Sequence, residues 1–136
     1  MLAPTTLNSN NGLPNEQVHT IAQDAYGRLW LAGPAGLVCY NGDQIKVFDT
    51  RSGLSCLGLR TIHISRQGFI WIGTDQGLEA FEIDGKKIEV HSDFEWKYGI
   101  AETIYSEDTR LWVGTSHGLL ILEDNPANTR RLHELD

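Results

Sequence analysis

The chain of 136 residues contains little of what builds several common classes of small protein. It has two cysteines, Cys39 in an apolar run and Cys56 in a loop, which predicts neither a disulfide framework nor a zinc site. No apolar run approaches the roughly 18 residues of a membrane-spanning helix, so no direct membrane insertion is expected. The N-terminus lacks a basic cap before an apolar stretch, and no signal peptide is therefore visible.

Basic residues are also few. Eleven Lys and Arg face 18 Asp and Glu, which gives a net charge of −7. Proteins that bind nucleic acid neutralise phosphates with clustered basic side chains, so nucleic acid is excluded as the main partner. The 14 glycines and 40% hydrophobic residues are typical of a turn-rich globular protein, and the length predicts a single domain over residues 1–136.

The sequence contains no arrangement of residues typical of catalysis or metal binding. No Ser/His/Asp set and no phosphate-binding glycine loop is present. The aspartates Asp24, Asp43 and Asp84 are isolated, which argues against a calcium loop. The histidines lack the spacing of metal ligands; they are His19, His63, His91, His117 and His133. We therefore expect no metal, no cofactor and no enzymatic activity.

Three copies of one ten-residue pattern dominate the chain. They read "RLWLAGPAGL", "FIWIGTDQGL" and "RLWVGTSHGL" and begin at residues 28, 69 and 110. The tryptophans Trp30, Trp71 and Trp112 are 41 residues apart both times, and the glycines at 36, 77 and 118 keep the same interval. A fixed period near 40 residues indicates a repeat architecture. Because the three tryptophans occupy one place in the repeat, we interpret them as core residues between repeats.

Each copy predicts four short strands joined by tight turns. Asn-Gly at 41–42 and Asp-Gly at 84–85 are strong hairpin signals, and "IEVH" at 88–91 is the expected fourth strand of the second copy. No segment shows helical periodicity. The consecutive apolar residues of "LWLA" and "IWIG" suit a sheet covered on both faces. The predicted fold is all-β: three four-stranded antiparallel blades of a β-propeller, at about 14–50, 55–92 and 98–136.

The segments "GLPNEQVHTIAQDAYGRLWLAGPAGL" and "GFIWIGTDQGL" resemble the two-component regulator propeller repeat, and the likeness extends over about residues 11–123. This resemblance implies the N-terminal sensor region of a bacterial signalling protein, with relay to an attached kinase or cyclase domain that these 136 residues lack. The chain departs from the repeat in places. Ala32-Gly33 stands where Gly-Thr is expected, "GLP" occurs once at 12–14, and the connector "SDFEWKYG" lacks the loop signature. The expected location is cytoplasmic as the chain stands, or periplasmic for an excised sensor segment.

Three blades do not close a propeller ring, which generally contains four to eight. The two outer faces would expose apolar residues unless further blades or a second copy of the chain covered them. We therefore expect the partners to be other propeller blades, supplied by a longer chain or by self-association. A stable 15.2 kDa monomer would contradict this expectation.

The positions that differ between copies are the candidate binding residues. Turn tips vary where the scaffold repeats, which is typical of a binding face, although exposed turns also accept polar residues without any function. Trp96 matches no residue of the repeat, and with Tyr98 it suggests either an exposed contact surface or a cluster packed beneath the connector. Arg51 and Arg60 are either binding residues or solvated charges. The full set is Asp75, Gln76, Ser116, His117, Trp96, Tyr98, Arg51 and Arg60.

Two functions remain open at this point. The first is a non-catalytic module that senses a ligand, such as a saccharide, or a protein partner in signal transduction. The second is a structural module that mediates oligomerisation or protein interaction and binds no small molecule.

Overall fold

The computed structural model describes residues 10, 12–13, 17–34, 36–55, 57–92 and 94–135, which form three antiparallel sheets of four strands. The first sheet contains β1 (Thr20–Gln23), β2 (Leu29–Gly33), β3 (Gly36–Tyr40) and β4 (Ile45–Phe48). The second contains β5 (Leu59–Ile64), β6 (Ile70–Thr74), β7 (Gly77–Phe81) and β8 (Lys87–Ile88). The third contains β9 (Ala101–Glu107), β10 (Arg110–Thr115), β11 (Gly118–Glu123) and β12 (Arg131–Leu135). The 3-10 turns are η2 (Thr50–Ser52) and η3 (Pro126–Asn128).

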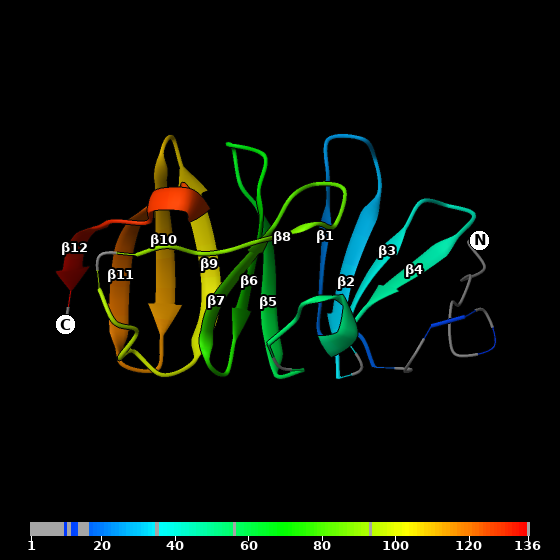
Figure 1. The fold of residues 1–136 in the computed structure, drawn as a ribbon, viewed down its shortest axis with the longest axis horizontal. Coiled ribbons are helices and arrows are strands. Elements are labelled where there is room, and N and C mark those ends of the chain that lie inside the picture. Colours follow the sequence, from blue (N-terminus) through cyan, green and yellow to red (C-terminus); the bar gives the residue numbers. More distant parts are fainter. Residues whose placement is uncertain are drawn as a thin grey trace, which may run out of the picture.

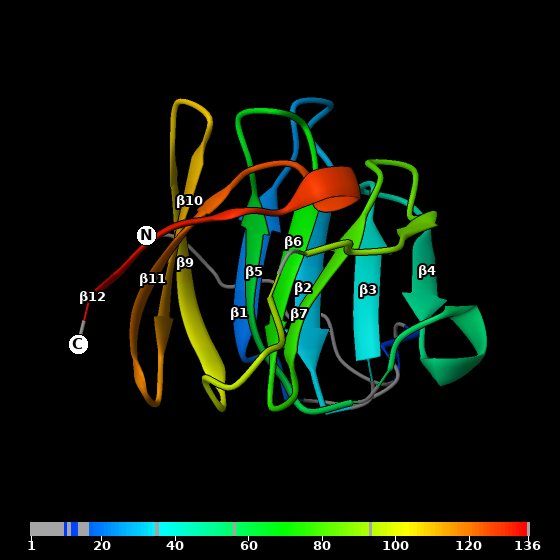
Figure 2. The same ribbon diagram turned by 60° about the vertical axis from the view of Figure 1, so that its left-hand side comes forward.

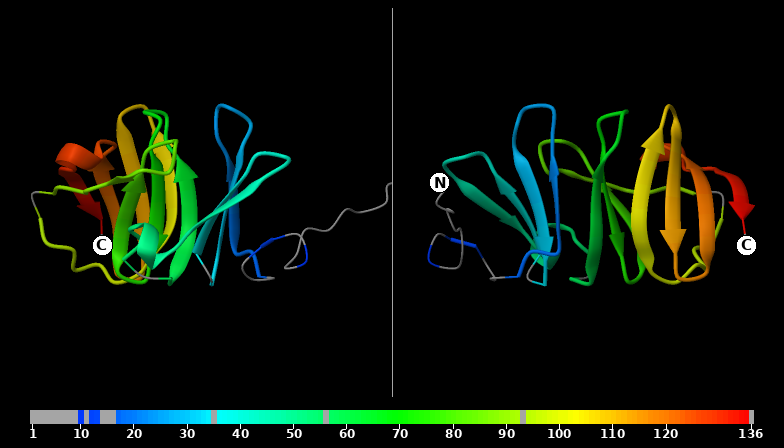
Figure 3. Two further views of the ribbon diagram at one scale, coloured as in Figure 1. Left: turned by 45° about the vertical axis from the view of Figure 1, so that its right-hand side comes forward. Right: turned by 180° about the vertical axis from the view of Figure 1, so that it is seen from behind.

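The three sheets stand side by side in chain order (Figures 1 and 3). Within each sheet the strands follow one another from first to fourth, and β1, β5 and β9 lie next to one another at the inner edge of the row. This is a β-propeller segment of three blades, as predicted. Neither of the described helical turns is long and apolar enough to cross a membrane.

Tryptophan-bearing strands form the core of each interface between sheets. Trp30 packs between the first and second sheets (the first interface), where its ring lies 5.7 Å from that of Phe48. Trp71 packs between the second and third sheets (the second interface) against β10 and β11. Every residue of β6 is buried, because this strand has a sheet on both faces. The consecutive apolar residues of β6 are therefore explained by burial on both faces, as the sequence suggested.

The Gly-Thr-x-x-Gly pattern is a turn that closes itself. In the second sheet the Thr74 hydroxyl accepts a hydrogen bond from the Gln76 backbone N–H and donates one to the Gly77 carbonyl. Thr115 makes the same two bonds in the third sheet. Gly77 has a φ of 128°, a backbone conformation that glycine adopts without steric cost. The residues after Trp71 and Trp112 thus fix the β6–β7 and β10–β11 turns.

The fourth strand of the second sheet is shorter than "IEVH" predicts. β8 covers only Lys87–Ile88, because the chain then leaves the second sheet and pairs with the third. The His91 backbone N–H donates to the Pro126 carbonyl, and the His91 carbonyl accepts from the Thr129 N–H. Figures 1 and 2 both show this segment passing beside η3. Strand periodicity in the sequence could not reveal this competing partner.

The outer faces of the first and third sheets expose apolar residues. At the interfaces between sheets, residues at equivalent positions are buried. Ile62 and Ile104 follow the repeated Thr of their copies and are 6% and 8% exposed, whereas their counterpart Ile21 is 58% exposed. On the far side of the row, Tyr105 of β9 is 59% exposed. Leu13 covers part of the outer face of the first sheet by packing against Leu31 and Val38.

Candidate functional site

The sheets have two ends with different loops. One end carries the β2–β3, β6–β7 and β10–β11 turns together with the segments that join successive sheets, and we call it the connector end; it is the lower edge in Figure 1. The opposite end carries the turns between first and second strands and between third and fourth strands. All of the predicted binding residues lie at or next to the connector end, and all are among the described residues: Asp75, Gln76, Ser116, His117, Trp96, Tyr98, Arg51 and Arg60.

An ion pair fixes the β6–β7 turn. Arg60 Nε lies 2.6 Å from Asp75 Oδ1, and the Asp75 backbone N–H donates to the Gly58 carbonyl. The hydrogen bond and the charge of Asp75 raise the pKa of the Arg60 guanidinium. Both side chains are nearly half exposed, so the pair is accessible to a ligand but contributes little to stability.

The aromatic residues of the second connector pack beneath it. Tyr98 is buried, and its ring meets that of Trp96 edge-on at 5.5 Å. The Trp96 indole N–H donates to the Gly99 carbonyl, and its ring lies over the Cα of Gly77. The packed cluster, one of the two alternatives open from sequence, is therefore the arrangement found. Tyr98 offers no exposed ring face for a ligand.

Trp96 does have a counterpart in the repeat, contrary to the sequence-based interpretation. Leu13, Leu54 and Trp96 each stand seven residues before the repeated Thr. All three pack against the sheet that follows them in the chain, on the face of that sheet that is directed toward the N-terminal end of the row. Leu13 and Leu54 both follow a glycine with positive φ, so the "GL" of the single "GLP" recurs at 53–54. Counting back from the Thr would have identified this position, but the change from Leu to Trp concealed it.

The β10–β11 turn is fastened to the same connector. Ser116 Oγ accepts a hydrogen bond from the Ile100 N–H at 3.0 Å, and His117 Nδ1 lies 3.4 Å from the Lys97 carbonyl oxygen. Seven of the eight predicted residues thus surround the connector end of the second interface. Arg51 does not join them, because it lies in η2 of the first connector and pairs with Asp49.

A cavity of about 160 Å³ lies beside this cluster. Its lining includes Gln76, Ser92, Phe94 and Trp96, and it combines polar groups with aromatic edges. Of the predicted residues only Gln76 and Trp96 line it. The described residues hold no group of three His, Cys, Asp or Glu side chains able to bind a metal ion. The arrangement suits binding of a small polar ligand.

At the opposite end, the first interface contains a complete polar network around Asp24, although this aspartate is isolated in the sequence. Asp24 Oδ2 accepts from Trp30 Nε1 at 2.9 Å and from Arg28 Nε at 2.8 Å. Oδ1 accepts from the backbone N–H groups of Tyr26 and Arg28. Arg28 also donates to the Ile83 carbonyl of the second sheet at 2.6 Å. The guanidinium therefore bridges the two sheets.

The network changes the acidity of Asp24. Burial acts to raise the pKa of this carboxyl, but the hydrogen bonds from Trp30, Arg28 and Tyr26 together outweigh burial, so the pKa lies below its ordinary value. The carboxylate is thus held in its charged form.

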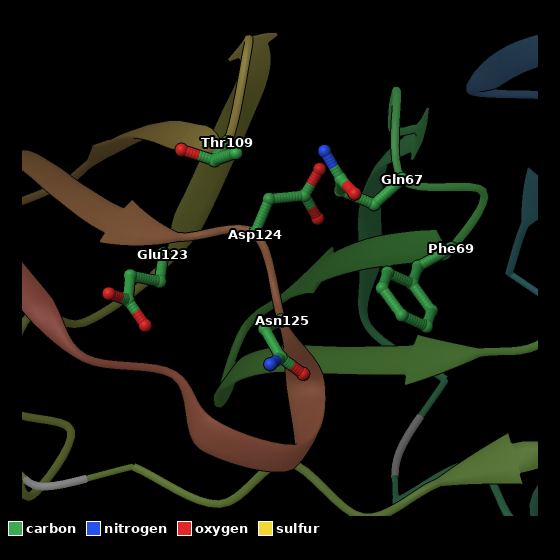
Figure 4. A pocket seen from close by; sticks show the side chains of 6 residues that line it. All are labelled: Gln67, Phe69, Thr109, Glu123, Asp124 and Asn125. Atoms are coloured by element: carbon green, nitrogen blue, oxygen red, sulfur yellow. The ribbon is translucent and has the colours of Figure 1, made fainter.

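In the second interface the indole N–H of the tryptophan has a different acceptor. Trp71 Nε1 donates to Asp124 Oδ1 at 2.7 Å, and Asp124 belongs to the turn after β11 of the third sheet. Asp124 is 3% exposed, and its Oδ2 is buried without a hydrogen-bond partner among the described residues. Beside it opens a cavity of about 470 Å³, lined by Gln67, Phe69, Thr109, Glu123, Asp124 and Asn125 (Figure 4). No single-residue pattern in the sequence indicates this site.

His63 also spans the second interface. Its Nε2 lies 2.7 Å from Ser106 Oγ of the third sheet. Burial lowers the pKa of His63 and the negative charge of Asp124 opposes this shift, with the net result that the pKa lies below 6.5.

Comparison with known proteins supports the predicted resemblance. Residues 12–35 match the family model described as two component regulator propeller. No curated protein matches the chain. A solved structure of the extracellular domain of BT3049 from B. thetaiotaomicron, described as a hybrid two component system, is similar with a TM-score of 0.72 and 21% identity, over 91% of this chain and 17% of that one. The extracellular domain of BT4673 from the same organism, described as a one component system, gives a TM-score of 0.68 and 16% identity, over 88% and 19%.

This chain therefore spans less than a fifth of the length of the domains that it resembles. At these identities the likeness shows the β-propeller fold.

Proposed function

We propose that the chain is part of a non-catalytic sensing propeller that acts outside the cytoplasm in a bacterial signalling protein. The match of residues 12–35 to the regulator propeller model and the extracellular origin of the two similar domains support this proposal. Sensing takes place at the connector end of the second interface, and the ligand is a small polar molecule such as a saccharide.

The observation that carries the proposal is that two variable residues from different segments line one cavity. Gln76 from the β6–β7 turn and Trp96 from the connector line the same 160 Å³ space, although they are 20 residues apart in sequence. The second and third sheets both contribute to its wall, through Leu78 and Leu122. A ligand that contacts both sheets favours one packing angle between them, and this is how binding would reach an attached output domain.

A titration with a panel of neutral saccharides, followed by calorimetry, tests the proposal. We expect saturable binding that Gln76→Ala weakens by about tenfold, because one polar contact to a ligand is lost. Arg51→Ala is the matched control, since Arg51 lies in the other connector, and it should bind as the unaltered chain does. Loss of binding in both variants, or in neither, would contradict the proposed location.

The variant Trp96→Ala distinguishes a contact of Trp96 with the ligand from a role of Trp96 in packing. We expect both stability and saccharide binding to fall. A large loss of stability with unchanged binding would remove Trp96 from the proposed site.

A second candidate function is assembly through the outer faces, and the exposure of Ile21 and Tyr105 favours it. The chain would then pair with neighbouring blades, from a longer chain or a second copy. Sedimentation of the 136-residue chain should show self-association. A stable, soluble 15.2 kDa monomer would contradict the need for neighbouring blades and leave the saccharide test unaffected.

A further inference from the structure

We infer that the 470 Å³ cavity at the opposite end of the second interface is a binding site for a guanidinium group. The site is separate from the connector end, so the test of this inference is independent of the proposed sensing function. The two interfaces provide different acceptors for the indole N–H groups of equivalent tryptophans.

The first interface shows the complete arrangement. The carboxylate of Asp24 receives the Trp30 indole N–H and the Arg28 guanidinium on one oxygen and two backbone N–H groups on the other. A guanidinium group lies between the carboxylate and the next sheet, where it reaches the Ile83 carbonyl. Each of the two oxygens of this buried acid thus accepts from two donors.

The second interface has the acid, but among the described residues no Lys or Arg is paired with it. Counting 41 residues onward, Trp71 replaces Trp30, Ser65 replaces Asp24, Phe69 replaces Arg28 and Asp124 replaces Ile83. The carboxylate has thus moved from the sheet of the tryptophan to the following sheet. One oxygen keeps the indole bond, and the other is buried without a partner among the described residues.

The unpartnered oxygen belongs to a residue that lines a cavity of suitable size. Ligand pockets commonly measure about 300–1,000 Å³, and a single water molecule takes up about 30 Å³ of liquid. Asp124 lines the space with Gln67 and Phe69, and Figure 4 shows the Asp124 carboxylate and the Gln67 amide pointing toward each other. A buried carboxylate oxygen without a donor is unfavourable, so a cation that reaches it gains a strong hydrogen bond.

The lining selects a planar cation. Among the described residues no Lys or Arg lines the cavity, and Glu123, whose side chain points away in Figure 4, is already paired with Arg130 at 2.8 Å. Asp124 therefore provides negative charge that no lining cation neutralises. The ring of Phe69 provides a face on which a guanidinium can stack, and the Gln67 amide provides a further acceptor. The ligand is either a small guanidinium compound or an arginine side chain.

Titration of the ¹⁵N-labelled chain with methylguanidinium tests the inference, at constant ionic strength set with NaCl. The indole N–H signal of Trp71, assigned with Trp71→Phe, should shift saturably. The signal of Trp30 is the internal control and should not move, because Arg28 already occupies its site. N-methylurea, which has a similar shape without charge, should leave both signals in place.

Asp124→Asn is the decisive variant. Its amide oxygen can still accept the Trp71 bond, while the unpartnered acceptor becomes a donor, so the variant should fold and bind methylguanidinium at least about tenfold more weakly. Phe69→Arg, which copies the arginine of the first interface, should fill the site and abolish the shift. Glu123→Gln removes one charge outside the cavity and should change affinity by less than about twofold.

Three results would overturn the inference. They are a Trp71 shift that N-methylurea reproduces, a methylguanidinium affinity that Asp124→Asn leaves unchanged, and no saturable shift at all, which would mean that the cavity holds water only. To separate the two sources, an arginine-containing peptide and free methylguanidinium are compared. Tighter binding of the peptide assigns the site to a protein side chain, and equal or weaker binding assigns it to a small compound.

Discussion

The two interfaces between sheets are built from the same repeat but are closed in different ways. In the first, Asp24 and Arg28 of one sheet complete a network around Trp30, and the connector contributes Leu54. In the second, Asp124 reaches Trp71 from the neighbouring sheet, and the connector contributes the larger Trp96. Both tryptophans are completely buried.

The difference shows which positions of the repeat are fixed by packing between the sheets. The position of the tryptophan is fixed, because it fills the space between sheets and provides much of the buried apolar area. The acceptor for its indole N–H is not fixed, because a carboxylate from either sheet can reach the same point. The third tryptophan, Trp112, has a buried indole nitrogen without a partner among the described residues, and it lies on the outer face. We propose that a neighbouring blade supplies its acceptor.

The largest effect is expected when an interior tryptophan is removed. Trp71→Ala should lower the free energy of unfolding by about 3–5 kcal/mol, because a large buried side chain leaves a cavity. Trp112→Ala should cost about 1–2 kcal/mol in the isolated chain, since less of its area is covered on the outer face. Unfolding in urea measures both. Equal losses would show that the outer face is already covered by a partner.

The two carboxylates should differ in the next comparison. Asp24→Ala should cost about 2–3 kcal/mol, because it leaves a buried indole N–H and a guanidinium without their acceptor. Asp124→Ala should cost about 1 kcal/mol or less, because the lost indole bond is partly offset by removal of an unpartnered charge. Matched urea titrations of the two variants compare them. A larger loss for Asp124→Ala would indicate that its second oxygen is occupied in solution.

A pH titration distinguishes the interfaces further. The folded-state pKa of His63 lies below 6.5, so the unfolded chain binds a proton first as the pH falls. Stability should therefore be full above pH 6.5, decrease as the pH falls through this value, and level off below the folded-state pKa. Ala22 occupies the equivalent place in the first interface, so His63→Gln should remove this dependence.

The control for the pH experiment is His19→Gln, since His19 is exposed. This variant should keep the decrease of the unaltered chain. Stability of His63→Gln that still decreases over the same pH range would assign the effect to another group.

The smallest effect is expected at the connector end. Arg60→Ala removes an ion pair between two side chains that are nearly half exposed, and it should change the free energy of unfolding by less than about 1 kcal/mol. Thermal unfolding of this variant beside Asp75→Ala measures the effect. A loss of several kcal/mol would mean that the pair is buried by a further part of the protein.

The sequence by itself determined the all-β class, the three sheets of four antiparallel strands and the place of the tryptophans. These features depend on local chemistry that recurs: the 41-residue interval, the hairpin turns, and Thr74 and Thr115 closing their own turns. Local signals of this kind can be read from one chain, because the groups that interact are a few residues apart.

Only the tertiary structure decided how the interfaces are closed. Asp124 and Trp71 are 53 residues apart, and neither residue indicates the other in the sequence. In the same way, the backbone of His91 hydrogen-bonds to Pro126 and Thr129 and does not continue the second sheet, so β8 is short. Contacts across sheets depend on which side chain reaches a common point in space, and residue spacing along the chain does not contain that information.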